Sequence, residues 1–446
     1  MLRKQWIVLL LIFCCGTILF AGGKGGEKEK AAAVMELKFW HHEPVDYRMA
    51  AFQEVVDRFQ AENPGIHLVQ EAVPWDDVWA KLAAAIKSGT SPDFQWDNPN
   101  MNIFAYEGGG IIPVTDIVEE IDKKYGYYET LTKPYYHDGE YWGVPIWHIP
   151  HALIYHPSYF KDYLGTTKPP KNWKELLEYA KKLTIDKNGD GTPDIYGIAM
   201  TAGKDFCAQE QLWDFLAPAG ASLFDKNGKV VFNSPATIKT MKFYAELAKY
   251  EPPAVTAWSW GEIEMNLPAG TMAMTPYYGA GLKLFWEEGN TDVAAAEMPI
   301  PEGGKKGALM HPEGIMVFNT AKEKGHLDAV KSFIIFGMAP ENHWILTAKQ
   351  EPGLYYPSTK AQLDAPYFWD YEPHAKYPDF VRTLAKVVEY GTSPGFTYGA
   401  VNLSTGRIYG ANILPDMIQR IILSGESPEA AVKWAHDKIV EMSTIK

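Results

Sequence analysis

Two patterns of apolar residues alternate along the first hundred positions of the chain. Residues 36–42 alternate in polarity and stop before Pro44, which predicts a strand. From Asp46 onward, apolar residues recur at the spacing of one helical face, and the sequence Asn-Pro-Gly at 63–65 ends this predicted helix. The apolar positions of this face are Met49, Phe52, Val55, Val56 and Phe59.

The same two patterns then repeat. Residues 66–73 read as a second strand, residues 76–88 as a second helix closed by Gly89, and residues 92–97 as a short third strand. Strands that alternate with helices in this way predict a parallel sheet with crossover helices.

A stretch rich in proline and aromatic residues follows at 139–160. Pro145 and Pro150 each lack the N–H that a strand ladder uses, so we expect them to bracket a segment that crosses between domains. A short apolar strand is expected directly after it, at 152–155. The aromatic and histidine side chains of the crossing would face a cleft at the domain interface.

Helices dominate the rest of the chain. Asn172 can cap a helix at its N-terminus, and Glu175 completes a capping box. Residues 298–307 are rich in proline and glycine and read as a second crossing. Helices are predicted over 173–183, 205–224, 236–250 and 327–336, strands over 270–275 and 313–318, and mainly helix beyond 358.

Size and charge narrow the class of protein. A length of 446 residues exceeds one typical core and favours two or three domains. The formal net charge of −13 argues against nucleic acid and against anionic membrane surfaces as partners. Aromatic residues make up 13% of the chain, with 15 Trp and 25 Tyr, which is more than core filling alone requires.

The N-terminus has the three parts of a secretory signal peptide. Arg3 and Lys4 precede an apolar run over 6–20, and small residues at 21–23 offer a cleavage site. We expect a signal peptide over 1–23 and a flexible tether over 24–33. An uncleaved anchor and lipid attachment at Cys14 or Cys15 are the alternatives. After cleavage Cys207 would be the one remaining cysteine, which excludes an intramolecular disulfide and a cysteine-based metal site.

Several motifs, in the right order and spacing, resemble the bacterial extracellular solute-binding proteins that serve ABC importers. Residues 59–65, 74–75, 81–93 and 113–117 are similar to motifs of the family's first lobe. Residues 139–156 resemble its Gly-x-Tyr-Gly-Val-Pro…Tyr-Asn segment, with His156 in place of Asn. Residues 169–183, 270–274, 353–357 and 427–432 resemble its later motifs.

The resemblance implies a two-lobed periplasmic-binding-protein fold of type II, in which each lobe has a mainly parallel sheet flanked by helices and the ligand cleft lies between the lobes. The implied first lobe covers 34–145 and 301–375, and the implied second lobe covers 146–300 and 376–446. It also implies a monomer outside the cytoplasmic membrane that closes over a carbohydrate, most simply an oligosaccharide, and then docks on a permease.

Candidate ligand-binding residues lie near predicted strand ends and crossings, because the crevice of an α/β protein lies outside the carboxyl ends of its strands. Aromatic rings can stack on the C–H faces of sugars, while carboxylates bind sugar hydroxyls. Core packing is the alternative for each ring, and solvated loops for each carboxylate; Trp75 and Trp173, at helix edges, are assigned to packing. The candidates are Trp40, His41, Trp96, Asp97, Trp147, Trp258, Trp260, Tyr277, Tyr278, Glu313 and Tyr355.

One loop has a calcium-binding pattern. Residues 186–194 place Asp, Asn and Asp at positions 1, 3 and 5 of an EF-hand-type loop, Gly at position 6 and Asp at position 9. The Glu expected at position 12 is replaced by Gly197, so a simple turn is the alternative to a structural Ca²⁺ site. The candidate ligands are Asp186, Asn188, Asp190, Thr192 and Asp194.

Other kinds of chemistry find little support. His41 and His42 are adjacent on a strand and would face opposite sides, which disfavours a metal site. The sequence has no nucleophile elbow, zincin motif or phosphate-binding loop, and no cofactor is expected beyond the calcium ion. Two alternatives to a sugar receptor stay open: a secreted glycoside hydrolase, and a receptor of the same fold for another solute, such as a glycerol phosphate or a polyamine.

Overall fold

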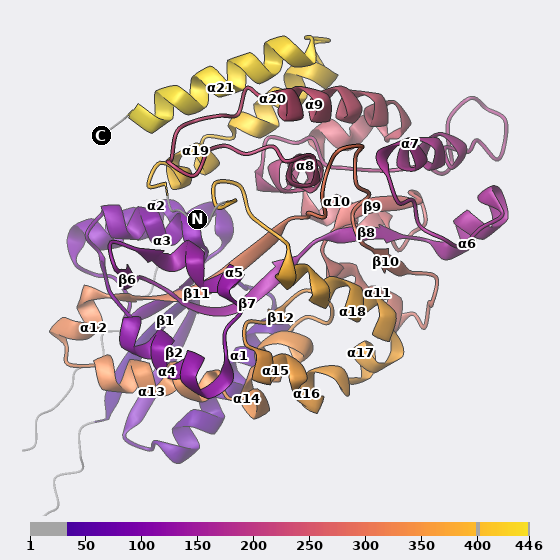
Figure 1. Cartoon of the computed structure of the whole chain (residues 1–446). Helices are drawn as coiled ribbons and strands as arrows, with labels where there is room; N and C mark the ends of the chain where they lie inside the picture. The colour runs from indigo at the N-terminus through magenta and orange to yellow at the C-terminus, as the bar shows by residue number, and fades with distance from the viewer. Residues whose placement is uncertain (1–33, 398–401, 445–446) are drawn as a thin grey trace, which may run out of the picture.

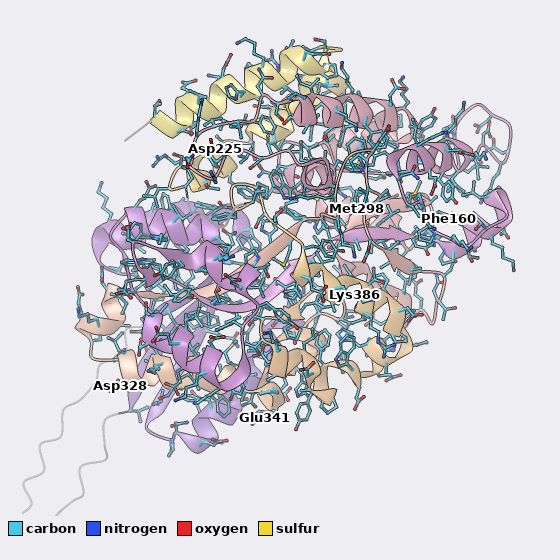
Figure 2. The ribbon with its side chains drawn as sticks, viewed as in Figure 1. Phe160, Asp225, Met298, Asp328, Glu341 and Lys386 are labelled. Carbon is cyan, nitrogen blue, oxygen red and sulfur yellow. The ribbon has the colours of Figure 1, made fainter. Side chains whose placement is uncertain are left out.

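The computed structural model describes residues 34–397 and 402–444 and shows two lobes (Figure 1). The first lobe has a seven-stranded sheet and the second a three-stranded one. Separate apolar cores lie in the two lobes. In Figure 2, Asp328 and Glu341 mark the first lobe, while Phe160, Asp225 and Met298 mark the second.

The predicted strand–helix alternation at the start of the first lobe is confirmed. β1 (Met35–His41) lies between β2 (Ile66–Ala72) and β3 (Phe94–Asp97), and both pairs are parallel. α1 (Asp46–Glu62) buries Phe52, Val55, Val56 and Phe59 of the predicted stripe. α2 (Trp75–Ser88) begins one residue earlier than predicted and ends at Gly89, whose φ of 67° suits a residue without Cβ.

The remaining strands of the large sheet run antiparallel to their neighbours. The order is β12-β7-β11-β3-β1-β2, and β4 also pairs with β11. The prediction of a mainly parallel sheet in the first lobe is therefore wrong beyond its first three strands. These antiparallel strands are β4 (Ile111–Ile112), β7 (Val144–Pro150), β11 (Met310–Phe318) and β12 (Tyr356–Pro357).

Pro145 and Pro150 lie inside β7, which the sequence did not predict. β7 pairs with β11 on one side, but on the other side β12 pairs only with Trp147 and His148. Both prolines therefore lie beyond the short stretch in which β7 has strands on both sides. Tolerance of proline where a ladder partner is missing explains this difference.

Helices cover the first lobe in addition to α1 and α2. In Figure 1, α4 (Thr115–Tyr125) and α13 (Leu327–Gly337) lie beside each other at the outer edge of this lobe, and the contacts between them agree. A hairpin of β5 (Tyr136–His137) and β6 (Glu140–Tyr141) turns at Asp138 and Gly139, which both have positive φ, as a tight hairpin turn requires. The other helices are α3 (Pro99–Glu107), α4 (Thr115–Tyr125), α5 (Glu129–Thr132), α12 (Asn319–Glu323), α13 (Leu327–Gly337) and α14 (Pro340–Trp344).

The sheet of the second lobe is antiparallel throughout. β8 (Ala152–Tyr155) lies between β9 (Met274–Tyr277) and β10 (Ala294–Ala296) and runs opposite to both. The expectation of a mainly parallel sheet is wrong here as well. The family resemblance suggested parallel strands, but strand direction depends on how the connections run, which local patterns do not encode.

The helices of the second lobe surround this small sheet. The predicted cap at Asn172 is confirmed, because its side chain accepts a hydrogen bond from the Glu175 N–H at 2.9 Å. The Glu175 carboxylate, however, accepts from the Lys171 N–H rather than from that of Asn172. The helices are α6 (Pro157–Tyr159), α7 (Trp173–Lys182), α8 (Phe206–Ala219), α9 (Pro235–Leu247), α10 (Trp260–Asn266), α11 (Leu282–Glu287), α19 (Thr405–Gly410), α20 (Ile413–Ile422) and α21 (Pro428–Thr444).

The chain crosses between the lobes three times. β7 leaves the large sheet at Pro150 and β8 enters the small sheet at Ala152, while β11 returns to the large sheet from Met310. These crossings lie five and nine residues beyond the predicted boundaries of 145 and 301 (150 − 145; 310 − 301). The third crossing runs through short helices: α15 (Lys360–Asp364) contacts α4, α16 (Pro366–Trp369) follows, α17 (Glu372–Lys376) contacts α11, and α18 (Pro378–Ala385) contacts β10.

Candidate binding site between the lobes

A cavity of ≈ 430 Å³ lies between the two lobes. Its first-lobe side is formed by the end of β1, the starts of α1 and α2, and parts of β3 and β11. Its second-lobe side is formed by α8, α10, α19 and the residue after β9. Aromatic residues dominate the lining: Tyr47, Trp75, Trp79, Trp96, Phe206, Trp260, Tyr278, Tyr355 and Tyr409.

The sheet of the first lobe holds one aromatic wall in place. Trp96 is 1% exposed, and its indole N–H donates to Glu313 Oε2 at 2.7 Å. The ring of Trp147 packs behind it, with centroids 5.1 Å from Trp96 and 4.9 Å from Tyr355. Burial raises the pKa of the Glu313 carboxyl well above its usual range, although the Trp96 hydrogen bond acts in the opposite direction.

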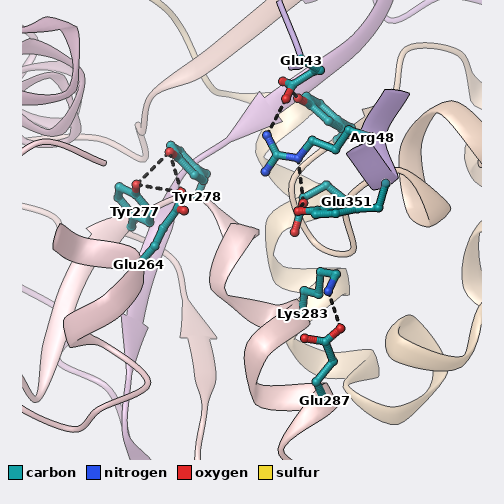
Figure 3. Close-up of polar contacts among 10 residues, drawn as sticks. Glu43, Arg48, Glu264, Tyr277, Tyr278, Lys283, Glu287 and Glu351 are labelled. Atoms are coloured by element: carbon teal, nitrogen blue, oxygen red, sulfur yellow. Dashed lines mark hydrogen bonds and ion pairs between the residues drawn. The ribbon is translucent and has the colours of Figure 1, made fainter. Parts of the chain in front are cut away.

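An arginine and two glutamates form a charged network at the edge of this wall (Figure 3). Arg48 Nη1 lies 2.6 Å from Glu43 Oε2, and Arg48 Nε lies 2.8 Å from Glu351 Oε2. The Tyr355 hydroxyl donates to Glu43, and the Tyr47 hydroxyl donates to Glu351. Burial raises the pKa of Glu351, and Arg48 offsets part of this shift. The network joins α1 to a loop some 300 residues further along the chain.

A short helix carries most of the opposite wall. The Ser259 N–H donates to Glu262 Oε2 at 2.8 Å, which completes the capping box at the start of α10. Trp260 and Glu264 then lie one turn apart on this helix and both line the cavity. The Tyr278 hydroxyl donates to Glu264 Oε1 at 3.2 Å, as Figure 3 shows.

A second carboxylate, from α8, lies deeper in this lobe. Glu210 Oε1 lies 3.0 Å from His311 Nε2 and accepts a hydrogen bond from the Tyr409 hydroxyl at 2.7 Å. Burial works to raise the pKa of Glu210, but His311, His151 and the hydrogen bond from Tyr409 together outweigh it, and the pKa is lowered overall. The cavity is therefore aromatic on its walls and carboxylate-rich at several points.

Five of the eleven predicted ligand-binding residues line the cavity, namely Trp96, Trp260, Tyr278, Glu313 and Tyr355. The structure brings together these residues of both lobes, although they lie far apart in the sequence. Their contact with a ligand stays a prediction.

The other six residues do not line the cavity. Asp97 is fully buried and accepts from Asn102 Nδ2 at 2.7 Å. Its neighbour Trp96 faces the cavity, as expected when successive strand residues face opposite sides. Trp147 packs behind the first wall, and Tyr277 stacks behind Tyr278 at 4.0 Å.

The remaining three residues pack against other parts of the two lobes. Trp40 donates its indole N–H to Glu71 at 2.8 Å and packs near α2. His41 turns toward α1, where its ring stacks on Phe52 at 4.7 Å, while the following His42 reaches the cavity. Trp258, just before α10, is half-buried and packs against the core of the second lobe.

Sequence reasoning missed more than half of the lining. Trp75, assigned to packing, and Trp79 both line the cavity, and their i, i+4 spacing at the start of a helix was a usable signal. The spacing of Trp260 and Glu264 was another. The other missed lining residues are His42, Glu43, Pro44, Val45, Tyr47, Arg48, Asn98, Ile149, Phe206, Glu210, His311, Leu354 and Tyr409.

The lobes also touch outside the cavity. Arg407 Nη1 on α19 lies 2.9 Å from both carboxylate oxygens of Glu107 on α3. On another side, Lys283 Nζ on α11 lies 4.9 Å from the centre of the Tyr47 ring on α1. These contacts connect the lobes at two places besides the crossings.

The calcium prediction remains untested. The Asp186 carboxylate accepts hydrogen bonds from the N–H groups of Gly189 and Gly191, and Asn188 and Asp190 cap the turn in the same way. Within residues 34–397 and 402–444, no group of three or more His, Cys, Asp or Glu side chains is arranged to hold a metal ion.

Comparisons with known proteins point to one family. The bacterial extracellular solute-binding protein family matches residues 44–352. A putative binding protein of Brucella abortus is 25% identical over 98% of both chains. The arabinooligosaccharide-binding protein of Halalkalibacterium halodurans is 23% identical over 91% of this chain and 88% of that protein.

Solved structures agree with the fold. Maltose-bound MalE3 of T. maritima has a TM-score of 0.76 at 16% identity and covers 91% of this chain and 99% of its own. A solute-binding protein from Agrobacterium radiobacter in complex with ribitol has a TM-score of 0.75 at 19% identity, covering 92% of this chain and 99% of its own. The predicted two-lobed fold is thereby confirmed, and the chain belongs to the bacterial extracellular solute-binding protein family.

Proposed function

We propose that this protein captures a carbohydrate outside the cytoplasmic membrane and delivers it to the permease of an ABC importer. The observation that carries the proposal is the cavity of ≈ 430 Å³ between the lobes, with aromatic side chains on both walls and carboxylates beside them. Flat aromatic faces can stack on sugar rings, and carboxylates accept hydrogen bonds from hydroxyls. The volume lies within the usual range for small-ligand sites, roughly 300–1,000 Å³.

The names of related proteins support a polyhydroxylated ligand. The relative from Halalkalibacterium halodurans is named for arabinooligosaccharides, and similar structures hold maltose, ribitol or tagatose. These ligands differ in size and ring form, but all carry several hydroxyl groups. The sugar class is therefore the proposal, and an oligosaccharide is its more specific form.

A phosphorylated ligand fits this cavity poorly. The glycerol-3-phosphate-binding protein of Shigella dysenteriae is a relative, 24% identical over 75% of this chain. The lining, however, includes four glutamates and one arginine, and the Nε and Nη1 groups of Arg48 already bind carboxylates. A phosphate would meet more negative than positive charge, which opposes its binding.

Catalysis is the other alternative. Incubation with a panel of oligosaccharides separates the two functions, because a receptor returns the sugar intact whereas a glycoside hydrolase releases shorter products. We expect saturable binding and no shorter products in chromatography.

Export and docking complete the proposal. Residues 1–23 and 24–33, the predicted signal peptide and tether, lie outside the described residues. Elsewhere in the chain, among the residues that the structure describes, no helix is both long and apolar enough to cross a membrane. We propose an exported monomer whose closed form is recognised by the permease. Membership of a family of extracellular solute-binding proteins supports this location.

A thermal-shift screen with mono- and oligosaccharides tests the function directly, and small-angle scattering tests closure. We expect a bound sugar to raise the melting temperature and to reduce the radius of gyration, because groups on both lobes contact it. Scattering curves that stay identical at saturating ligand would rule out closure of the lobes on binding. A panel in which no sugar shifts the melting temperature would contradict the proposed ligand class.

A further inference from the structure

The cavity has an imbalance of charge that a neutral sugar would not need. Four glutamates line it, from both lobes. Among the basic side chains of the lining, His42 is neutral near pH 7 because burial lowers its pKa to about 4, which leaves Arg48 and His311. The lining glutamates are Glu43, Glu210, Glu264 and Glu313.

Both of these basic side chains already have carboxylate partners. Arg48 binds Glu43 and, from outside the lining, Glu351, at 2.6 and 2.8 Å. His311 lies 3.0 Å from Glu210. Arg48, the lining residue with a fixed positive charge, is therefore shared between two negative charges, and no basic side chain is left over to balance the other glutamates of the lining.

Glu264 and Glu313 are the two glutamates without a basic partner among the described residues. Glu264 is within hydrogen-bond distance of the Tyr277 and Tyr278 hydroxyls, and Glu313 accepts from the Trp96 indole. Burial raises the pKa of both carboxyls, and Arg48 offsets only part of the shift at Glu264. This direction is the one expected for buried carboxylates that lack a counter-charge.

The two carboxyls lie on opposite lobes and among aromatic rings. Glu264 belongs to α10 of the second lobe, beside Trp260, whereas Glu313 belongs to β11 of the first lobe, beside Trp96. Aromatic faces attract cations through the negative charge density above the ring, and this attraction grows when water is excluded. Carboxylates and ring faces together form a site suited to a desolvated ammonium group.

We propose that the ligand is a basic sugar, a mono- or oligosaccharide with a protonated amine, and that Glu264 and Glu313 bind its positive charge from the two lobes. The inference rests on the proposed carbohydrate-binding function and makes its ligand class more specific. It also gives a reason for closure. An ammonium group that contacts a carboxylate of each lobe favours the closed arrangement over an open one, in which it can contact only one lobe.

Binding should then release protons. In the empty cavity the raised pKa values favour the protonated carboxyls, and an ammonium group lowers those values again. Affinity for the amine should therefore rise as the pH increases toward the carboxyl pKa values of the free protein, as long as the amine remains protonated. The charged or titratable groups that interact with these two carboxyls are Glu43, Arg48, Asp97, Tyr135, Cys207, Glu210, Tyr277, Tyr278, Glu351, Tyr355 and Tyr409.

Matched sugar pairs test the inference by titration calorimetry. Each pair differs only in amines that replace hydroxyls: one amine for glucosamine against glucose, and two amines for the β-1,4-linked glucosamine disaccharide against cellobiose. At pH 6 and low salt we expect the amine of at least one pair to bind about tenfold or more tightly than its hydroxyl counterpart. Hydroxyl sugars that bind as well as, or better than, their amine counterparts would overturn the inference and leave the carbohydrate function intact.

Spermidine is a further probe, which separates binding of a cation from binding of a carbohydrate. Spermidine carries ammonium groups but no sugar ring. Binding of spermidine together with failure of every sugar would overturn the carbohydrate function and retain the site for a cation. Failure of the sugars and of spermidine alike would overturn both.

Two variants that each remove a carboxylate charge test whether Glu264 and Glu313 cause the preference for the amine sugar. We expect Glu264→Gln and Glu313→Gln each to weaken binding of the amine about tenfold, while the affinity for the hydroxyl counterpart changes by less than about threefold. Glu302→Gln, at an exposed position outside the cavity, is the control for a lost negative charge. Thermal melts confirm that the variants are folded. Equal losses for the amine and the hydroxyl sugar would show that the carboxylates act only as acceptors for hydroxyls, and would overturn the inference.

Discussion

The two walls of the cavity are built in different ways. The first-lobe wall stands on a seven-stranded sheet, and its central ring, Trp96, is 1% exposed and backed by the fully buried Trp147. The second-lobe wall stands on the seven-residue helix α10, where Trp260 and Glu264 are only partly buried. The tryptophan and glutamate side chains of the two walls thus have different structural roles. In the first lobe they also pack in the core, whereas in the second they mainly line the cavity.

The largest expected effect is on the core beneath the first wall. Trp96→Ala should lower the free energy of unfolding by about 3–5 kcal/mol, because it leaves a cavity beside Trp147 and removes the hydrogen bond to Glu313. Trp260→Ala, in the other wall, should lower it by less than about 1 kcal/mol. Denaturant unfolding followed by circular dichroism measures both. Similar losses from the two variants would refute the distinction between the walls.

Acid should destabilise the first lobe through its buried histidines, and alkali should destabilise the part of the second lobe around Glu251. In the first lobe, burial lowers the pKa of His41, His42 and His343 to about 4 and that of His148 to about 3. In the second lobe, burial raises the pKa of Glu251 to about 8. The neutral histidines stabilise the first lobe above pH 6.5, and this stability is lost as the pH falls toward 4. The neutral Glu251 stabilises the second lobe below pH 4.5, and this stability is lost as the pH rises through 8.

Hydrogen exchange with mass spectrometry at several pH values resolves the lobes separately. After correction for intrinsic exchange rates, first-lobe peptides should lose protection toward pH 4, by up to about 3 kcal/mol for one histidine. Second-lobe peptides around Glu251 should lose protection toward pH 8. Equal losses of protection in both lobes toward pH 4 would contradict the comparison, and Glu251→Gln should abolish the alkaline loss around position 251.

The second-lobe wall should contribute mainly to the affinity for the ligand. Trp260→Ala is expected to weaken sugar binding by about 1–3 kcal/mol, since it removes a partly exposed ring face from the cavity. Trp258→Ala is the matched control, because Trp258 lies two residues earlier and does not line the cavity. Titration calorimetry with the best sugar of the thermal-shift screen gives both values. An equal loss in the control would show that the effect is structural rather than a loss of contact.

A smaller effect concerns the loop at 186–194 in the second lobe. If calcium binds there, chelation with EDTA should lower the melting temperature by about 2–4 °C, the shift expected for roughly 1 kcal/mol in a domain of this size. Ligand affinity well below the melting temperature should stay the same, because the loop does not line the cavity. A melting curve that EDTA leaves unchanged would leave the loop as a turn held by its own hydrogen bonds.

The smallest effect should come from the ion pair that joins the lobes. Glu107→Gln weakens the contact with Arg407, which is partly exposed, so the expected change is about 0–1 kcal/mol. The free protein should then sample more open arrangements, visible as a slightly larger radius of gyration. Glu120→Gln, on α4 of the first lobe, removes a charge without affecting an interlobe pair and should leave the scattering curve unchanged.

The family resemblance and the local patterns together predicted much of the architecture. The apolar stripe of α1, the parallel strands β1 to β3 and the cap at Asn172 all follow from short-range periodicity, which the sequence displays directly. The lobe boundaries implied by the family lay within ten residues of two crossings. Strand direction beyond β3 could not be read in this way, because it depends on where a returning segment such as β11 inserts.

The sequence by itself determined that aromatic and acidic side chains would gather near strand ends, but only the tertiary structure decided which of them share a cavity. Trp96 and Asp97 are adjacent, and a strand turns one toward the cavity and the other into the interior of the first lobe. Arg48 and Glu351 are some 300 positions apart, and no local pattern connects them. Periodicity indicates which face of an element is buried. The packing of distant elements then determines which side chains line the cavity between the lobes.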